Sequence, residues 1–134
     1  MGWQVGEVRE TLVVDDLKRT QIVQYAGASG DYNPLHTDEV FATQVAGYPS
    51  VFAHGMLTMG MTGRAVTDAV GVESLLRFGG RFTSQVWPGD TLTVRVTVDA
   101  VDDTADGRTV SFTLSTVNQD GNEVFSGYAA ARVA

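Results

Sequence analysis

The clearest pattern along the chain is a strict alternation of apolar and polar residues in its second half. Between Thr91 and Ala100 every second residue is apolar: Leu92, Val94, Val96, Val98 and Ala100. A repeat of this period predicts a β-strand with one buried face. The same alternation returns between Thr109 and Val117, where the apolar side is formed by Val110, Phe112 and Leu114. We therefore expect two half-buried strands in this region.

Two further segments, Leu75–Val86 and Val124–Val133, are expected to be strands without a single clean face. Residues typical of turns separate the strands, at Trp87–Asp90, Asp102–Gly107 and Asp120–Asn122. Because parallel neighbours need a long crossover, connections this short predict a mainly antiparallel sheet. An earlier segment, Thr11–Val14, is expected to add an edge strand.

The first half of the chain has helical patterns. Apolar residues spread around much of the circumference of Met56–Val70, which predicts a buried helix. Gly60 and Gly63 interrupt it at a cost of about 1 kcal/mol each relative to alanine, so we expect another group to approach closely there. Lys18–Ala28 is predicted to be a shorter amphipathic helix. The resulting fold class is α+β, with one long central helix wrapped by a curved antiparallel sheet.

Composition narrows the possible functions. The chain has 134 residues, 43% of them hydrophobic and 19% charged, as expected for one globular domain over residues 1–134. The chain has no cysteine, which excludes disulfides and thiolate metal sites. We find neither a signal-peptide pattern nor an apolar run of about 20 residues, and we expect a cytoplasmic protein without membrane contact.

The net charge of −7 argues against nucleic-acid binding, which needs a basic surface. Three of the nine basic residues, Arg64, Arg77 and Arg81, nevertheless lie close together in sequence. Two interpretations are open for them: solvated surface charges, or a local patch for a phosphate group or an acidic partner.

Two short segments carry candidate chemistry. In Ala28–His36, Gly30 and Pro34 prevent a regular helix, so this is expected to be a loop that points Asp31 and His36 at one spot. An imidazole is the natural base near neutral pH, and a neighbouring carboxyl group can orient the same water. Taken singly, Asp31 is equally an ordinary turn residue and His36 a packed or solvated loop histidine.

The second segment, Phe52–Leu57, begins the predicted long helix. Gly55 leaves a bare backbone N–H at the helix N-terminus, where unpaired donors and the helix dipole favour an oxyanion. His54 is interpreted as a cap or hydrogen-bond anchor rather than a catalytic group. A metal site built from Asp31, His36 and His54 lacks a fourth ligand and is not expected. A proton-transfer pair beside an oxyanion site is what hydration of an unsaturated thioester requires.

The two segments together resemble a known family. Tyr25–His36 is similar to the signature of the MaoC-like (R)-specific enoyl thioester hydratases and dehydratases, and Ala53–Leu57 resembles the start of that family's central helix. Within the family, the resemblance is greatest to the catalytic subunits of mycobacterial (3R)-hydroxyacyl-ACP dehydratases. It extends over almost the whole chain.

The resemblance implies a hot-dog fold and a catalytic dyad of Asp31 and His36 acting on one water. It implies that the Gly55 N–H binds the thioester oxyanion, that Asn33 braces the loop and that His54 supports the site. The implied substrates are acyl-CoA or acyl-ACP thioesters, without cofactor or metal. The implied assembly is a homodimer, or a heterodimer with a second hot-dog subunit.

One position departs from the family pattern. Some members place a serine nine residues after the histidine that precedes the helix, where this chain has Gly63. We therefore expect the pocket to be roomier at that point. Two other functions remain as alternatives, an acyl thioesterase on the same fold and a non-catalytic acyl-binding partner subunit. The presence of both Asp31 and His36 favours the hydratase.

Overall fold

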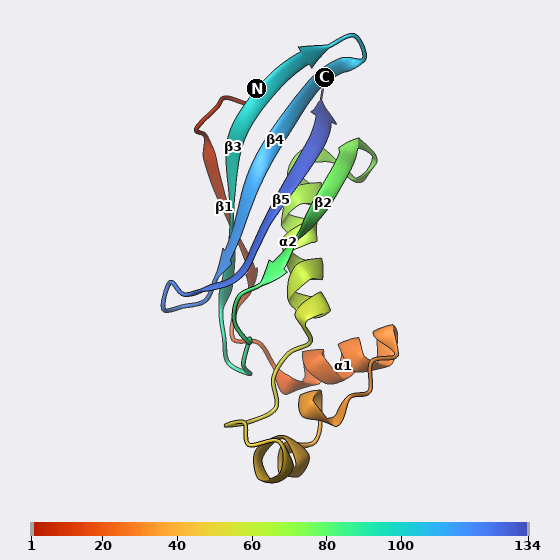
Figure 1. The fold of residues 1–134 in the computed structure, drawn as a ribbon, viewed down its shortest axis with the longest axis vertical. Coiled ribbons are helices and arrows are strands. Elements are labelled where there is room, and N and C mark those ends of the chain that lie inside the picture. The colour runs from red at the N-terminus through yellow and green to blue at the C-terminus, as the bar shows by residue number, and fades with distance from the viewer. Residues whose placement is uncertain (1, 134) are drawn as a thin grey trace.

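The computed structural model describes residues 2–133, and its main feature is one five-stranded antiparallel sheet (Figure 1). The strands are β1 (Val8–Val14), β2 (Leu75–Phe82), β3 (Leu92–Thr104), β4 (Gly107–Val117) and β5 (Glu123–Val133). Their order in the sheet is β1-β3-β4-β5-β2, and all neighbouring strands are antiparallel. β1 is an edge strand, as predicted, and β2 forms the other edge.

The alternating residues of β3 and β4 form the centre of the core, as predicted. Their inward-facing side chains are at most 2% exposed: Leu92, Val94, Val96, Val98, Val110, Phe112 and Leu114. The register pairs Val96 with Leu114 and Val98 with Phe112. A bulge after Val98 then shifts the alternation, so Val101 packs against the core while Ala100, expected on that face, is only half-buried.

Two predicted strand boundaries were wrong. Asp102–Gly107 was expected to be a turn, but β3 continues to Thr104 and β4 begins at Gly107. The acidic end of β3 stays paired, helped by a 3.1 Å contact from Arg108 Nε to Asp103 Oδ1. Conversely, β2 ends at Phe82 because its ladder with β5 ends there, and residues 83–86 form a loop.

The long helix α2 (Gly55–Val70) lies along the sheet as predicted (Figure 1). Its buried stripe consists of Thr58, Thr62, Ala65 and Val66. The expectation that the helix is buried almost all round was wrong, since Met56 is 56% exposed. The sheet of a single chain covers only one side of α2, which makes the helix amphipathic.

The two helix glycines differ in their surroundings. A Cβ added at Gly63 would lie 3.2 Å from Cε2 of Phe78, so the predicted close approach occurs there. A Cβ added at Gly60 would meet nothing within 4 Å, and the prediction was wrong for that residue. The ring of Phe78 also occupies the space beside Gly63, so the expected extra room at this point is absent.

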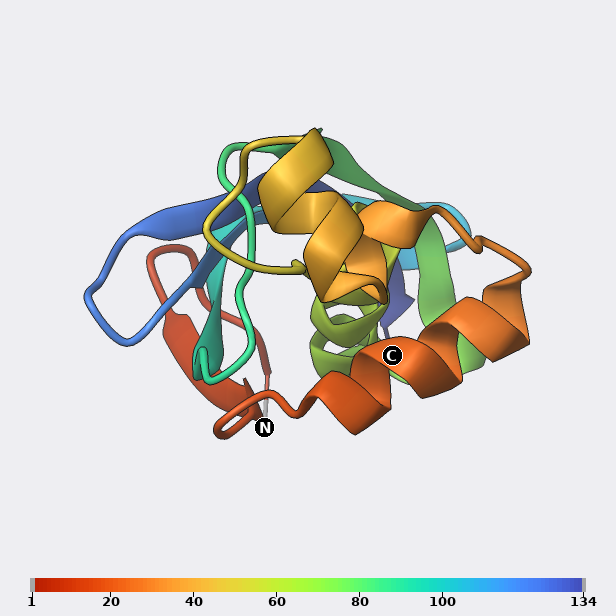
Figure 2. The ribbon, with the colours of Figure 1, turned by 90° about the horizontal axis from the view of Figure 1, so that it is seen from below.

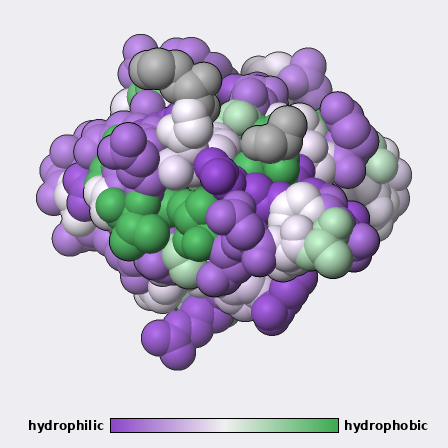
Figure 3. Space-filling model, turned by 90° about the horizontal axis from the view of Figure 1, so that it is seen from above, coloured by the Kyte–Doolittle hydropathy of each residue, from purple (hydrophilic) through white to green (hydrophobic). Residues whose placement is uncertain are grey.

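Except for η3, the remaining helices gather at one end of the sheet. α1 (Arg19–Ser29), η1 (Pro34–His36) and η2 (Phe41–Val45) lie near the start of α2 (Figure 2), and η3 (Val72–Ser74) follows the end of α2. α1 buries Ile22 and Ala26. Within residues 2–133, no helix is both long and apolar enough to cross a bilayer. Seen from the opposite end, the surface is mostly hydrophilic around a small apolar area (Figure 3).

Candidate active site

The first part of the site is the turn that follows α1. The helix is closed by Gly30, whose φ of +77° lies in the left-handed region that glycine adopts without strain. The next residue, Asp31, is exposed, and its Oδ1 accepts the backbone N–H of Asn33 at 3.3 Å. The Asp31 carboxyl group is thereby held at the start of the loop, as the sequence predicted.

A second turn presents His36. Oδ1 of Asn33 accepts the N–H of Leu35 at 3.0 Å and so caps the 3-10 turn η1, whose first residue is Pro34. At the end of η1, Nδ1 of His36 lies 2.6 Å from the carbonyl oxygen of Phe52. A carbonyl oxygen only accepts, so this nitrogen carries the hydrogen. In the neutral ring, Nε2 of His36 is therefore the nitrogen with the free lone pair.

His54 lies directly against His36. It is only 2% exposed, and the two imidazole rings stack with centroids 3.8 Å apart and planes inclined by 25°. Nε2 of His54 donates to the carbonyl oxygen of Asp31 at 3.0 Å. The side chain makes no capping bond to α2, so the anchor alternative, rather than the cap, describes its contact.

Burial governs the charge of His54. Its Nδ1 is buried without a hydrogen-bond partner among the described residues. Loss of solvent lowers the pKa of His54 below its ordinary value, and the neighbouring His36 lowers it further, although the bond to the Asp31 carbonyl acts in the opposite direction. The ring beneath His36 is therefore neutral near neutral pH.

The structure thus brings the predicted residues together. The candidate donor atoms of Asp31, His36 and His54 all lie within 4.8 Å of one another. These residue types also bind metals, but both rings already donate one N–H to a backbone carbonyl. The arrangement suits a carboxyl group and an imidazole base acting on one small molecule.

Gly55 is the first residue of α2 and follows His54 directly. The N–H groups of Gly55 and Met56 have no acceptor within residues 2–133. A Cβ at Gly55 would lie 2.9 Å from Cε2 of Phe82, so glycine is needed for this ring to pack here. The helix start therefore presents free donors next to His54 and its stacked neighbour His36.

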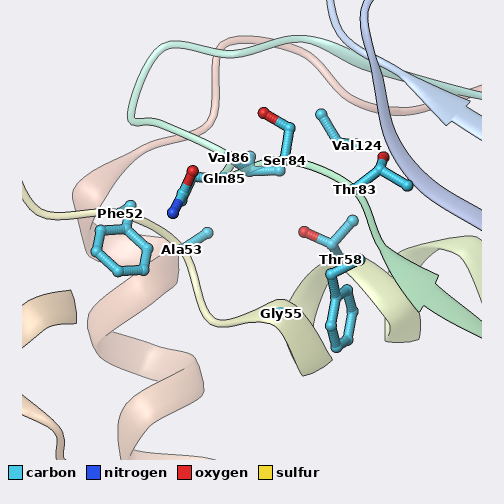
Figure 4. A pocket seen from close by; sticks show the side chains of 10 residues that line it. Phe52, Ala53, Gly55, Thr58, Thr83, Ser84, Gln85, Val86 and Val124 are labelled. Atoms are coloured by element: carbon cyan, nitrogen blue, oxygen red, sulfur yellow. The ribbon is translucent and has the colours of Figure 1, made fainter.

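A cleft of about 300 Å³ opens next to this helix start (Figure 4). One wall is the segment before and inside α2, the other is the end of β2 with the loop after it. The lining residues are Phe52, Ala53, Gly55, Thr58, Phe82, Thr83, Ser84, Gln85, Val86 and Val124. Phe52 and Gly55 connect the cleft to the site, because Phe52 also accepts the hydrogen bond of His36.

Sequence reasoning missed the polar lining of this cleft. Thr58 was counted within the central helix, and residues 83–86 were assigned to a strand. The Gln85 side chain belongs to the loop wall only because β2 ends at Phe82. Local sequence carries no signal for that early end, since it depends on the pairing with β5.

The three arginines of the middle region have different surroundings. Arg64 lies on α2, where its Nε is 4.0 Å from Oδ2 of Asp68. Arg77 lies on β2 with its guanidinium 5.0 Å from the ring centroid of Tyr128, and Arg81 lines a shallow groove on the same strand. Within residues 2–133, neither Arg77 nor Arg81 forms an ion pair.

Comparison with protein families decides the relationship. The family described as "MaoC like domain" matches residues 3–120. The chain belongs to the MaoC-like family. A similar protein, 3-hydroxyacyl-thioester dehydratase Y of Mycobacterium tuberculosis, is 46% identical over 67 residues, covering 48% of this chain and 23% of the relative. Enoyl-CoA hydratase ChsH3 of the same organism is 38% identical over 101 residues, covering 73% of this chain and 32% of the relative.

Solved structures of R-hydratases share the fold. The R-hydratase PhaJ1 of Pseudomonas aeruginosa has a TM-score of 0.83 and 26% identity, covering 98% of this chain and 82% of that one. The (R)-hydratase of A. caviae has a TM-score of 0.83 at 24% identity and covers 98% of both chains. These likenesses confirm the hot-dog fold. The chain spans less than a third of the length of the two curated relatives above.

Proposed function

We propose that this chain catalyses the reversible addition of water to a trans-2-enoyl thioester, giving the (3R)-3-hydroxyacyl thioester of CoA or of an acyl carrier protein. The observation that carries the proposal is the meeting of Asp31 and His36 beside the free N–H groups of α2. The family relationship and the named hydratases and dehydratases support it.

In the hydration direction, Nε2 of His36 takes one proton from water as the oxygen bonds to C3. The Asp31 carboxyl group holds the same water through its other hydrogen. Electrons of the double bond move toward the thioester oxygen, where the N–H of Gly55 stabilises the enolate-like charge. A proton then passes from the pair to C2. A hydroxyl and a hydrogen have been added, and the enzyme returns to its starting state.

His54 and Asn33 act as positioning residues in this proposal. His54 holds the backbone of Asp31 and stacks under His36, so it fixes the relative position of the pair. Because it is neutral, it does not repel the imidazolium that His36 becomes during the reaction. Asn33 holds the turn that carries His36.

The test of the reaction uses both directions. Purified protein should remove the enoyl absorbance of crotonyl-CoA and should form it from (3R)-3-hydroxybutyryl-CoA, but not from the (3S) isomer. Free CoA should not accumulate. Release of free CoA without loss of the double bond would establish a thioesterase instead, and binding without either reaction would establish an acyl-binding subunit.

We also propose that the chain pairs with a second hot-dog subunit through the free edge of β2, and that this subunit is another copy of the same chain. An exposed edge strand is a ready site for pairing. Apolar side chains are exposed on β2 and on β5 beside it, with Leu76 47%, Phe82 49% and Tyr128 47% exposed.

A matched pair of charge substitutions tests this assembly. Leu76→Lys on β2 should shift the molecular mass measured by light scattering toward the monomer. Val8→Lys on the opposite edge strand, where Val8 is 49% exposed, should leave the dimer intact. A monomeric wild-type chain, or equal effects of both substitutions, would refute pairing through β2. A dimer that forms only with a different hot-dog protein would support the heteromeric assembly.

A further inference from the structure

The hydroxyl group of Thr58 lies at the surface of the cleft and has no hydrogen-bond partner among residues 2–133. Thr58 is 2% exposed, and its Oγ1 forms no hydrogen bond with any residue in the range 2–133. The side chain lines the cleft beside Gly55, and Figure 4 shows its hydroxyl turned toward the space between the two walls. The only fully buried side-chain nitrogen or oxygen without a partner among residues 2–133 is His54 Nδ1, so the Thr58 hydroxyl is reached from the cleft and is free to bond to a ligand group there.

The other wall of the cleft also carries polar side chains, Thr83, Ser84 and Gln85, beside the apolar Phe82, Val86 and Val124. Gln85 faces Thr58 across the cleft in Figure 4, and its amide forms no hydrogen bond within the described residues. An alkyl chain placed between Thr58 and Gln85 would take both groups out of water without satisfying them. The cleft therefore suits a ligand segment that itself donates and accepts hydrogen bonds.

The direction of the substrate follows from the proposed function, on which this inference rests. With the thioester oxygen at Gly55 and C2 and C3 at Asp31 and His36, the sulfur must leave on the other side of the carbonyl carbon. The cleft borders Gly55, but neither residue of the dyad lines it. The cleft is therefore the space into which the part of the substrate beyond the thioester sulfur, its thiol arm, can extend.

Spacing along α2 fits the first amide of that arm. Thr58 comes three residues after Gly55, a rise of about 4.5 Å along the helix. In a pantetheine thioester an ethylene group separates the sulfur from the first amide, which is a comparable distance. We propose that this cleft binds the pantetheine arm, which CoA and acyl carrier protein share, and that Thr58 hydrogen-bonds its first amide.

Two small crotonyl thioesters test this contact. The N-acetylcysteamine thioester carries the first amide of pantetheine, and the S-ethyl thioester lacks it. Thr58→Val removes the hydroxyl while keeping the shape of the side chain. We expect kcat/KM for the N-acetylcysteamine thioester to fall about 5- to 30-fold, mainly through KM, because the contact is remote from the reacting atoms. The S-ethyl thioester should lose less than about 2-fold.

Thr62→Val is the matched control on the same helix. Thr62 is equally buried, but its hydroxyl already bonds to the Thr58 carbonyl at 3.0 Å and to Thr116 Oγ1 at 2.7 Å. This substitution should lower stability and change both thioesters alike. If Thr58→Val also lowers both thioesters equally, or lowers neither, the amide contact is refuted.

A binding measurement separates this inference from the proposed reaction. Butyryl-pantetheine has no double bond and cannot be hydrated, so its affinity is independent of turnover. Weaker binding to Thr58→Val than to wild type would support the subsite even if the wild type hydrates no thioester. Equal binding, or no binding to either protein, would overturn it even if the wild type is an active hydratase.

Discussion

A methyl group added at Gly55 should collide with the ring of Phe82. The ideal Cβ would lie 2.9, 3.0 and 3.1 Å from three ring carbons, whereas carbon atoms in contact normally lie about 3.5–4.0 Å apart. The ring belongs to the last residue of β2 and borders the cleft, so it is able to shift into that space rather than unfold the chain. Overpacking of this kind costs about 1–3 kcal/mol, and alanine's better helix propensity offsets up to about 1 kcal/mol. Gly55→Ala should therefore lower the free energy of unfolding by about 0–3 kcal/mol.

The effect on activity should be larger than the effect on stability. The displaced ring belongs to the cleft beside the proposed oxyanion donor. Moving the groups that position the substrate by about 1 Å or less lowers the reaction rate by up to about 100-fold. We therefore expect kcat/KM for crotonyl-CoA to fall about 10- to 100-fold. Urea unfolding and initial rates on the same preparations measure both quantities.

Two further variants isolate the cause. Gly60→Ala adds the same methyl group to the same helix where nothing lies within 4 Å, so it should stabilise the protein by about 0.5–1 kcal/mol and leave activity unchanged. In a Phe82→Ala background, Gly55→Ala should lose most of its penalty. If the two substitutions are additive within about 0.5 kcal/mol, the collision is not the cause and the reasoning fails.

Three other predictions concern pH, the loop and the carrier. His54→Gln keeps an N–H for the Asp31 carbonyl but does not titrate. The folded-state pKa of His54 is lowered, so wild-type stability should be full above the ordinary pKa of 6.5 and should fall, by at most about 1.4 kcal/mol per pH unit, as pH drops below it. Urea unfolding at high and low pH should show less acid destabilisation in His54→Gln, and an equal loss would contradict this. Asn33→Ala should cost about 0.5–2 kcal/mol through the lost cap of Leu35, whereas Asn33→Asp should retain most of that stability; equal unfolding midpoints would exclude the cap. Arg77→Glu should raise KM for acyl-carrier-protein thioesters and not for CoA thioesters. An unchanged KM for the carrier-protein thioesters would refute the interpretation that Arg77 helps to bind an acidic carrier protein.

The alternation of apolar and polar residues along the chain was sufficient to predict most of the fold. The alternation in β3 and β4 identifies the core face directly, because side chains of a strand point to opposite sides. The limits of the strands were less accessible, since they depend on partners distant in sequence. Phe82 ends β2 because the ladder with β5 ends at Phe125, and the acidic end of β3 persists because its pairing with β4 continues to Thr104, opposite Gly107.

The proximity of Asp31 and His36 was predictable for a different reason. Asp31 and His36 share one loop, and Gly30 and Pro34 mark that loop in the sequence. The stacking of His54 on His36 and the hydrogen bond from His36 to Phe52 arise only when two segments meet in space. Thr58 gave no signal, because an unpaired hydroxyl becomes meaningful only when its surroundings are known.

The most direct test of the account compares the rates of crotonyl-CoA hydration by wild type, Asp31→Asn and His36→Gln. Asp38→Asn is the control, because Asp38 is another nearby carboxylate, one that accepts the N–H of Phe41 at 3.1 Å and has no proposed catalytic role. We predict that each dyad substitution lowers kcat by about 100-fold or more, that the double variant is little worse than either alone, and that Asp38→Asn remains active. Activity close to that of wild type in Asp31→Asn or His36→Gln would contradict the proposal that these two residues act together on the water.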